Sequence, residues 1–212
     1  MSDPPGLLAA GGDLRPARVL AAYERGIFPW YSDRQPILWW SPDPRMVLYP
    51  GEFKCSRSLA KTLRSGRFET RLDTAFGETI RACAAPRRCG TDTWLNPQMI
   101  AAYEQLHAGG YAHSIETMHA GRLVGGLYGL QLGGVFFGES MFSRIADASK
   151  AALARLVEEC RRRDIDVIDC QVASEHLASL GAREIPRRKF AALLHARARR
   201  EPTGPWGEAP ER

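Results

Sequence analysis

The chain has 212 residues, of which 44% are hydrophobic and 25% charged, as in a globular protein with one ordinary domain, or one plus a small appendage. It lacks the long apolar run of a membrane span, the N-terminal pattern of a signal peptide and any C-x-x-C spacing among its five cysteines, so we expect a cytoplasmic protein with reduced thiols and no metal. The net charge of +5 alone does not establish nucleic-acid binding.

Residues 1–50 are rich in proline, glycine and tryptophan, and one helix fits them, over about residues 16–26. Asp13 is a candidate N-cap, and Pro16 suits the first turn, where a backbone N–H has no helical partner. The other pieces are short and extended. We therefore predict a small N-terminal domain that packs through its aromatic side chains.

Three helices are expected next, near residues 56–65, 73–84 and 96–109, from apolar spacings of three and four. The first carries a basic stripe on one helical face. Its members are Lys54, Arg57, Lys61 and Arg64. Such a stripe is either a solvated face or a track for nucleic-acid phosphates, whose contacts add affinity without reading sequence.

The second half of the chain alternates strands and helices. Turn signals at residues 120–121 and 133–134 predict three consecutive antiparallel strands. A helix from residue 148, a buried strand at VIDCQV, a helical turn, a short strand near 182–185 and a helix near 187–199 follow. We predict an α+β fold: residues 1–50 form the small domain, residues 51–200 form a mixed sheet of the N-acetyltransferase kind flanked by helices, and residues 201–212 form a flexible tail.

Three polar residues stand in apolar β segments. Asp169 and Gln171 share one strand face, because they are two residues apart, and Glu139 follows the apolar run at 135–137. An unpaired buried carboxylate is costly, so each needs a partner. The three are either hydrogen-bonded core residues or the floor of a shared polar cleft. Cys170 is a weaker candidate nucleophile, since apolar neighbours keep a thiol inert.

Apolar residues near these positions are candidates for a pocket. They are Trp30, Trp94, Leu127, Phe136 and Met141. Taken singly, each is better explained as a core residue. No phosphate-binding glycine loop of a nucleotide site and no G-x-S-x-G nucleophile motif occurs, so a bound cofactor is not expected.

Nine short strings resemble the bacterial leucyl/phenylalanyl-tRNA–protein transferases. They are GGDL (11–14), RGIFPWY (25–31), ILWWSPDPR (37–45), HSIE (113–116), LVGGLYG (123–129), FFGESMFSR (136–144), ASK (148–150), DCQ (169–171) and SLGAREIPR (179–187). The resemblance runs from about residue 6 to residue 190. The N-terminus is short and the C-terminal tail differs from the family's, but neither change affects a motif.

The resemblance implies an enzyme that moves Leu or Phe, and Met less well, from aminoacyl-tRNA to the α-amino group of proteins beginning with Arg or Lys. This marks them for degradation by the N-end rule pathway. It also implies a fold like the N-acetyltransferases, no cofactor or metal, no membrane partner, and action as a monomer.

The same resemblance assigns roles to single residues. Asp169, Gln171 and Glu139 become the catalytic group: Asp169 attracts and deprotonates the amine, Gln171 orients the ester, and Glu139 meets an ammonium or the terminal adenosine. The five apolar residues become the pocket for the aminoacyl side chain and adenosine, and the basic stripe becomes the tRNA-phosphate site. Two other functions compete with this one, an acetyl-CoA N-acetyltransferase and a non-enzymatic RNA-binding module. The first lacks its glycine loop, and the second leaves the buried acids unexplained.

Overall fold

The computed structural model describes residues 5–85, 94–200 and 206. The strands in these parts form two separate sheets. The small sheet has three antiparallel strands in the order β1-β3-β2, formed by Leu7–Ala10, Leu38–Trp40 and Phe28–Pro29. Its strands all come from the predicted N-terminal domain.

The large sheet has seven strands in the order β10-β4-β9-β8-β7-β6-β5. Its strands are, in chain order, β4 Arg45–Leu48, β5 Glu69–Leu72, β6 Ala112–His119, β7 Arg122–Leu132, β8 Val135–Ser143, β9 Val167–Gln171 and β10 Arg183–Ile185. All neighbours are antiparallel except β8 and β9, which are parallel. The predicted α+β fold with a mixed sheet is confirmed.

The predicted meander is β6, β7 and β8. Its first turn contains Ala120 and Gly121, both at positive φ (49° and 72°), the conformation that suits a tight hairpin. Its second turn contains Gly133, also at positive φ. Both turn predictions are therefore confirmed.

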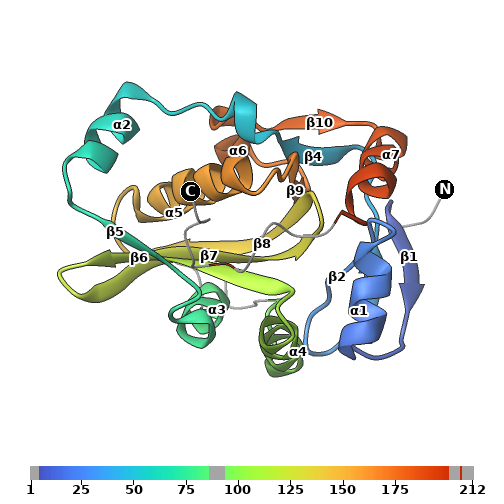
Figure 1. Cartoon of the computed structure of the whole chain (residues 1–212). Helices are drawn as coiled ribbons and strands as arrows, with labels where there is room; N and C mark the ends of the chain where they lie inside the picture. The colour runs from blue at the N-terminus through green and yellow to red at the C-terminus, as the bar shows by residue number, and fades with distance from the viewer. Residues whose placement is uncertain (1–4, 86–93, 201–205, 207–212) are drawn as a thin grey trace.

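Helices cover both faces of the large sheet (Figure 1). Helix α5 packs on one face, and α3 and α4 pack on the other. The helices are α1 Pro16–Tyr23, α2 Arg57–Arg64, α3 Phe76–Ala84, α4 Pro97–Ala108, α5 Ala148–Arg162, α6 Glu175–Ser179 and α7 Arg187–Arg197, with a short 3₁₀ turn at Pro50–Glu52. None of the helices described is long and apolar enough to cross a membrane.

Local sequence explains where these helices begin. Ser56 caps α2 by accepting the Leu59 N–H, and Asn96 caps α4 by accepting the Met99 N–H. The prediction that Asp13 caps α1 is wrong, because Arg15 occupies the N-cap position. Asp13 instead accepts the Arg15 backbone N–H and pairs with nearby arginine side chains.

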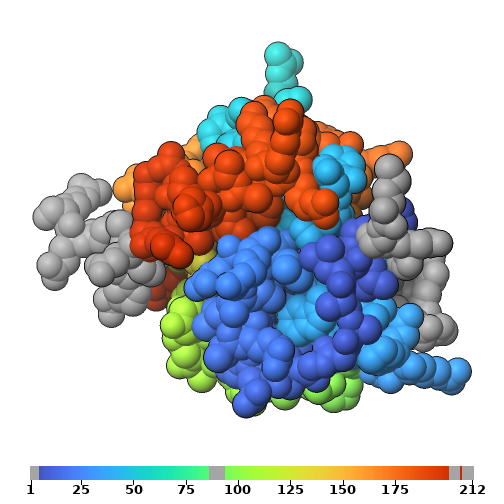
Figure 2. All heavy atoms as spheres, turned by 90° about the vertical axis from the view of Figure 1, so that its right-hand side faces the viewer, coloured from blue at the N-terminus to red at the C-terminus, as the bar shows by residue number. Residues whose placement is uncertain are grey.

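Two hydrophobic clusters lie on opposite sides of the large sheet. One joins α1, α3, α4, α7 and the small sheet, and includes Tyr23, Tyr103 and Phe190. The other lies under α5 and includes Leu127 and Phe136. The N-terminal subdomain lies directly beside α7, in blue and red-orange in Figure 2.

The domain boundary near residue 50 stays a prediction, although β4, which precedes it, pairs with β9 and β10 of the large sheet. The predicted flexible tail lies outside the described residues, apart from Trp206.

Candidate active site

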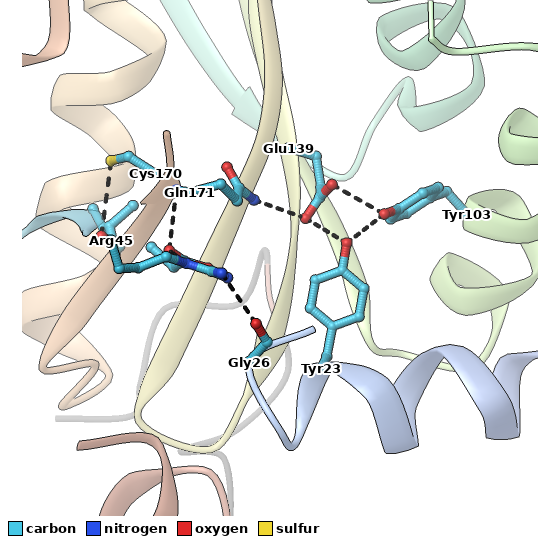
Figure 3. A network of polar contacts seen from close by, with 9 residues as sticks. Tyr23, Gly26, Arg45, Tyr103, Glu139, Cys170 and Gln171 are labelled. Carbon is cyan, nitrogen blue, oxygen red and sulfur yellow. Dashed lines mark hydrogen bonds and ion pairs between the residues drawn. The ribbon is translucent and has the colours of Figure 1, made fainter. Parts of the chain in front are cut away.

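The site lies where two central strands stop pairing. The parallel pairing between β8 and β9 runs from Val135 with Val167 to Phe137 with Asp169. Beyond it, β8 continues to Ser143 while β9 ends at Gln171. Glu139 and Gln171 stand just past the last pair, and the Gln171 side-chain N–H donates to Glu139 at 3.2 Å (Figure 3). The predicted polar residues of two β segments therefore lie together.

Two tyrosines hold the Glu139 carboxylate. The Tyr23 hydroxyl, from α1, donates to Oε1 at 2.7 Å, and the Tyr103 hydroxyl, from α4, donates to Oε2 at 3.0 Å. The two hydroxyls also lie 2.5 Å apart. Both phenols are buried, and this burial raises their pKa well above 10, so they stay protonated and act as donors.

The Glu139 carboxyl group is poised to exchange a proton near neutral pH. Desolvation raises its pKa to about 7, partly opposed by the hydrogen bonds from Tyr23 and Tyr103. The proton count agrees with this direction. The three contacts among Glu139, Tyr23 and Tyr103 need three protons, and two phenols supply two. A protonated Glu139 supplies the third proton, so all three contacts can be hydrogen bonds. With Glu139 ionised, one of the three contacts has no proton.

Asp169 has partners different from those expected of it. Its side chain is fully buried, and its two oxygens accept from Arg45 Nε at 2.7 Å and Nη2 at 2.6 Å. This bidentate pair leaves no open side for an incoming amine. The geometry corrects the expectation that Asp169 meets the amine directly and gives Asp169 a supporting position.

Arg45 is itself enclosed on all sides. Its third contact is a hydrogen bond from Nη1 to the Gly26 carbonyl at 3.0 Å. Its guanidinium lies over the rings of Phe28 and Phe190, at 4.9 and 4.7 Å from their centroids. Arg45 thus joins β4 and β9 to the N-terminal subdomain and to α7.

Gln171 is fixed in an uncommon backbone conformation. Its φ is +57°, a left-handed value that costs energy for a residue other than glycine. Its backbone N–H donates to Asp169 Oδ1 at 3.0 Å, which helps hold it there. The strand end is therefore locked, and the Gln171 amide is aimed at Glu139.

Sequence reasoning missed Tyr23, Tyr103 and Arg45 as site residues. The two tyrosines lie on apolar helix faces and look like core, although a buried tyrosine hydroxyl needs a partner and could have marked them. Arg45 ends the ILWWSPDPR string, but its partner lies 124 residues away. Cys170, the weaker candidate, is buried, and its thiol pKa is raised by desolvation, as for an inert cysteine.

The five predicted pocket residues divide into two groups. Leu127, Phe136 and Met141 belong to the cluster under α5. Trp94 packs against the cluster on the other side of the sheet, and Trp30 is 44% exposed beside Trp40. The apolar group under α5 and the two tryptophans therefore lie apart, and the assignment of all five to the aminoacyl and adenosine pocket stays a prediction.

The predicted basic stripe is exposed. Arg57, Lys61 and Arg64 lie on α2, while Lys54 precedes the helix, with its backbone N–H bonded to the Leu180 carbonyl. In the described parts of the chain, none of these four side chains forms an ion pair with an acid. Helix α2 lies at the opposite side of the large sheet from α1 (Figure 1).

Two family models match almost the whole chain. The leucyl/phenylalanyl-tRNA protein transferase model matches residues 47–195, and the model of that family's N-terminal domain matches residues 12–43. A leucyl/phenylalanyl-tRNA–protein transferase from Azoarcus sp. is 60% identical over 92% of this chain and 83% of its own length. One from Chromobacterium violaceum is 56% identical over 97% of this chain and 89% of its own length.

Similar solved structures are more distant. A GCN5-related N-acetyltransferase from Kribbella flavida has a TM-score of 0.43 and 11% identity, covering 76% of this chain and 58% of that one. L-PGS from Bacillus licheniformis has a TM-score of 0.44 and 10% identity, covering 74% and 53%.

Proposed function

The chain belongs to the leucyl/phenylalanyl-tRNA protein transferase family and is an aminoacyl-tRNA–protein transferase, and we propose that it moves Leu or Phe, and Met less well, to proteins with N-terminal Arg or Lys. The product would be marked for N-end rule degradation. We place this reaction in the cytoplasm, where aminoacyl-tRNA is made, and propose that the protein acts as a monomer.

The observation that carries the mechanism is the placement of the Glu139 carboxylate just past the last β8–β9 pair, where it accepts from Tyr23, Tyr103 and Gln171 and where burial raises its pKa to about 7. An α-amino group has a pKa of about 7.7–8.0, so the two groups are matched for proton exchange. Glu139 would receive the acceptor ammonium and take its proton. This gives the carboxylate the cation that its aromatic surroundings lack.

The reaction is aminolysis of an ester already activated by the tRNA. The amine nitrogen attacks the aminoacyl carbonyl, a C–N bond forms, and the C–O bond to the terminal ribose breaks. Glu139 gives the proton that it took from the ammonium to the departing ribose oxygen. It then takes the second proton from the attacking nitrogen and later releases it to solvent. Gln171 orients the carboxylate and the ester, while Asp169 and Arg45 hold the strand end. Orientation of this kind can supply on the order of 7–11 kcal/mol.

The donor side chain would enter the apolar group under α5. Leu127, Phe136 and Met141 lie on the face opposite the tyrosines, so the Leu or Phe side chain would pass between β8 and β9 where their pairing ends. Trp30 and Trp94, on the other side, would then contact the terminal adenosine rather than the side chain.

The exposed stripe on α2, with Lys54 beside it, would contact tRNA phosphates. Replacing Arg57, Lys61 and Arg64 together by Gln should weaken tRNA binding at low salt and make the slope of log K against log salt shallower by about 2–3. The rate at saturating tRNA should stay unchanged. An unchanged salt slope would show that α2 is a solvated face.

Single-turnover transfer of labelled Leu from Leu-tRNA to a peptide beginning with Arg tests the whole proposal. A peptide with an acetylated N-terminus is the control, because it has no free amine. Transfer to the free peptide alone is expected. Tight binding of Leu-tRNA without transfer would contradict the reaction while leaving RNA binding in place.

A further inference from the structure

Trp206 occupies a position built from three strands and the end of α5. Its indole N–H donates to Gln131 Oε1 at 2.6 Å, and its ring stacks on His113 with centroids 4.6 Å apart. The Phe136 ring lies 5.6 Å away, and the Arg163 guanidinium lies over the indole at 5.1 Å. These partners come from β7, β6, β8 and the residue that caps the C-terminus of α5.

The partners of Trp206 are fixed by bonds of their own. The Gln131 side-chain N–H donates to the Gly133 carbonyl at 3.0 Å, which turns its oxygen toward the indole. The His113 ring is held by Asp73 at 2.8 Å. Gln131 and His113 are only 6% and 7% exposed. A buried amide oxygen needs a donor, and the indole N–H supplies it, so Trp206 completes the hydrogen bonding of Gln131.

The site adjoins the apolar group proposed to take the donor side chain. Phe136 is the member of that group that Trp206 touches, and it is 1% exposed. Its ring lies against the backbone of Gly129, where an added Cβ would come within 2.4 Å of it. Phe136 is therefore confined by the strand backbone and by Trp206.

We propose that Trp206 is a specificity-determining residue that sets the depth of the aminoacyl pocket by holding the Phe136 ring in place. This inference rests on the proposed function of the α5-side group. With Trp206 removed, Phe136 gains room to move away from the donor. The pocket then accepts a larger side chain, and its preference for Leu falls.

The test compares one tRNA body charged in turn with Leu, Phe and Trp. We measure kcat/KM for each donor with wild type, Trp206→Ala and Trp206→Phe. For Trp206→Ala, the ratio of Trp to Leu should rise on the order of tenfold, the size of effect that one methylene group has in an apolar pocket. Trp206→Phe retains a ring and should shift the ratio less. Leu8→Ala, a truncation of a half-exposed side chain in β1, is the control and should leave the ratio unchanged.

A second variant tests the same contact in case Trp206→Ala does not fold. Gln131→Leu removes the acceptor of the indole N–H without touching the ring, and it should shift the ratio in the same direction by a smaller factor. If Trp206 only stabilises the fold, kcat/KM falls by the same factor for every donor, and the ratio of Trp to Leu stays constant in Trp206→Ala and in Gln131→Leu. That result overturns the proposal while Leu transfer itself persists. If wild type transfers no donor, the proposed function fails first and this inference fails with it.

Discussion

Two carboxylates stand on neighbouring strands, and their surroundings make them different groups. Asp169 lies on β9, fully buried, with both oxygens held by the guanidinium of Arg45. Glu139 lies on β8, half-buried, and its carboxylate is held by two phenols and an amide, none of them cationic. The strand pairing ends between them.

The difference lies in one cation. Arg45 fixes the Asp169 carboxylate, whereas the direct partners of Glu139 are neutral donors. A buried carboxylate beside a bidentate guanidinium is fixed in position by two charge-assisted hydrogen bonds. A carboxylate supported by neutral donors keeps a pKa near 7 and can take and release a proton at neutral pH. The two acids are linked, since Asp169 accepts the Gln171 backbone N–H and the Gln171 side chain donates to Glu139.

The largest effect is expected from Glu139→Gln. This change keeps the shape and the contact with Gln171 but removes the proton acceptor, so the single-turnover rate of Leu transfer should fall about 10²–10⁴-fold. The fold should remain, which circular dichroism and thermal unfolding can check. Glu158→Gln, an exposed change on α5, is the matched control and should leave the rate unaltered. A Glu139→Gln enzyme with full activity would remove the distinction between the two carboxylates.

Loss of Asp169 should act on stability first. Asp169→Ala leaves the Arg45 charge buried without its partner, which costs about 3–5 kcal/mol of unfolding free energy. The double variant Arg45→Met with Asp169→Leu removes both charges and should recover much of that loss. Urea denaturation measures both. If the double variant is no more stable than Asp169→Ala, the pair is not the buried ion pair described here.

The pH dependence of the rate separates the two acids directly. Glu139 must be ionised to take a proton, and burial raises its pKa to about 7, so kcat/KM should fall about tenfold per pH unit below that value. Above it kcat/KM should level off up to the amine pKa of about 7.7–8.0, beyond which the ammonium that Glu139 receives is lost. The measurement is single-turnover transfer from pH 5.5 to 9 with the peptide beginning with Arg. A profile without a break between pH 6 and 8 would contradict the assignment of Glu139.

The element pattern was predictable because helix and strand periods are local. The three-strand meander, its turns and the helix after it follow from alternating apolar residues and from glycines at positions that need positive φ. The polar residues Glu139, Asp169 and Gln171 stood out because each interrupts an apolar run.

The partners of these residues were not predictable in the same way. Whether Asp169 faces an amine or Arg45 depends on the antiparallel pairing of β4 with β9, which joins segments more than 100 residues apart. Likewise, the separation of Leu127 and Phe136 from Trp94 by the sheet follows from helix packing on two faces, which one sequence does not reveal.

The smallest effect is expected from Tyr103→Phe, and it probes why Glu139 titrates where it does. The Tyr103 hydroxyl donates to Oε2 and favours the ionised form, so its removal should raise the Glu139 pKa and shift the rate profile to higher pH by on the order of half to one unit. At pH 7 the rate should fall a few-fold, while at pH 9 it should approach that of wild type. Tyr111→Phe, at an exposed tyrosine, should leave the profile in place. An equal loss of rate at every pH would mean that Tyr103 acts through packing, and that burial alone sets the proton affinity of Glu139.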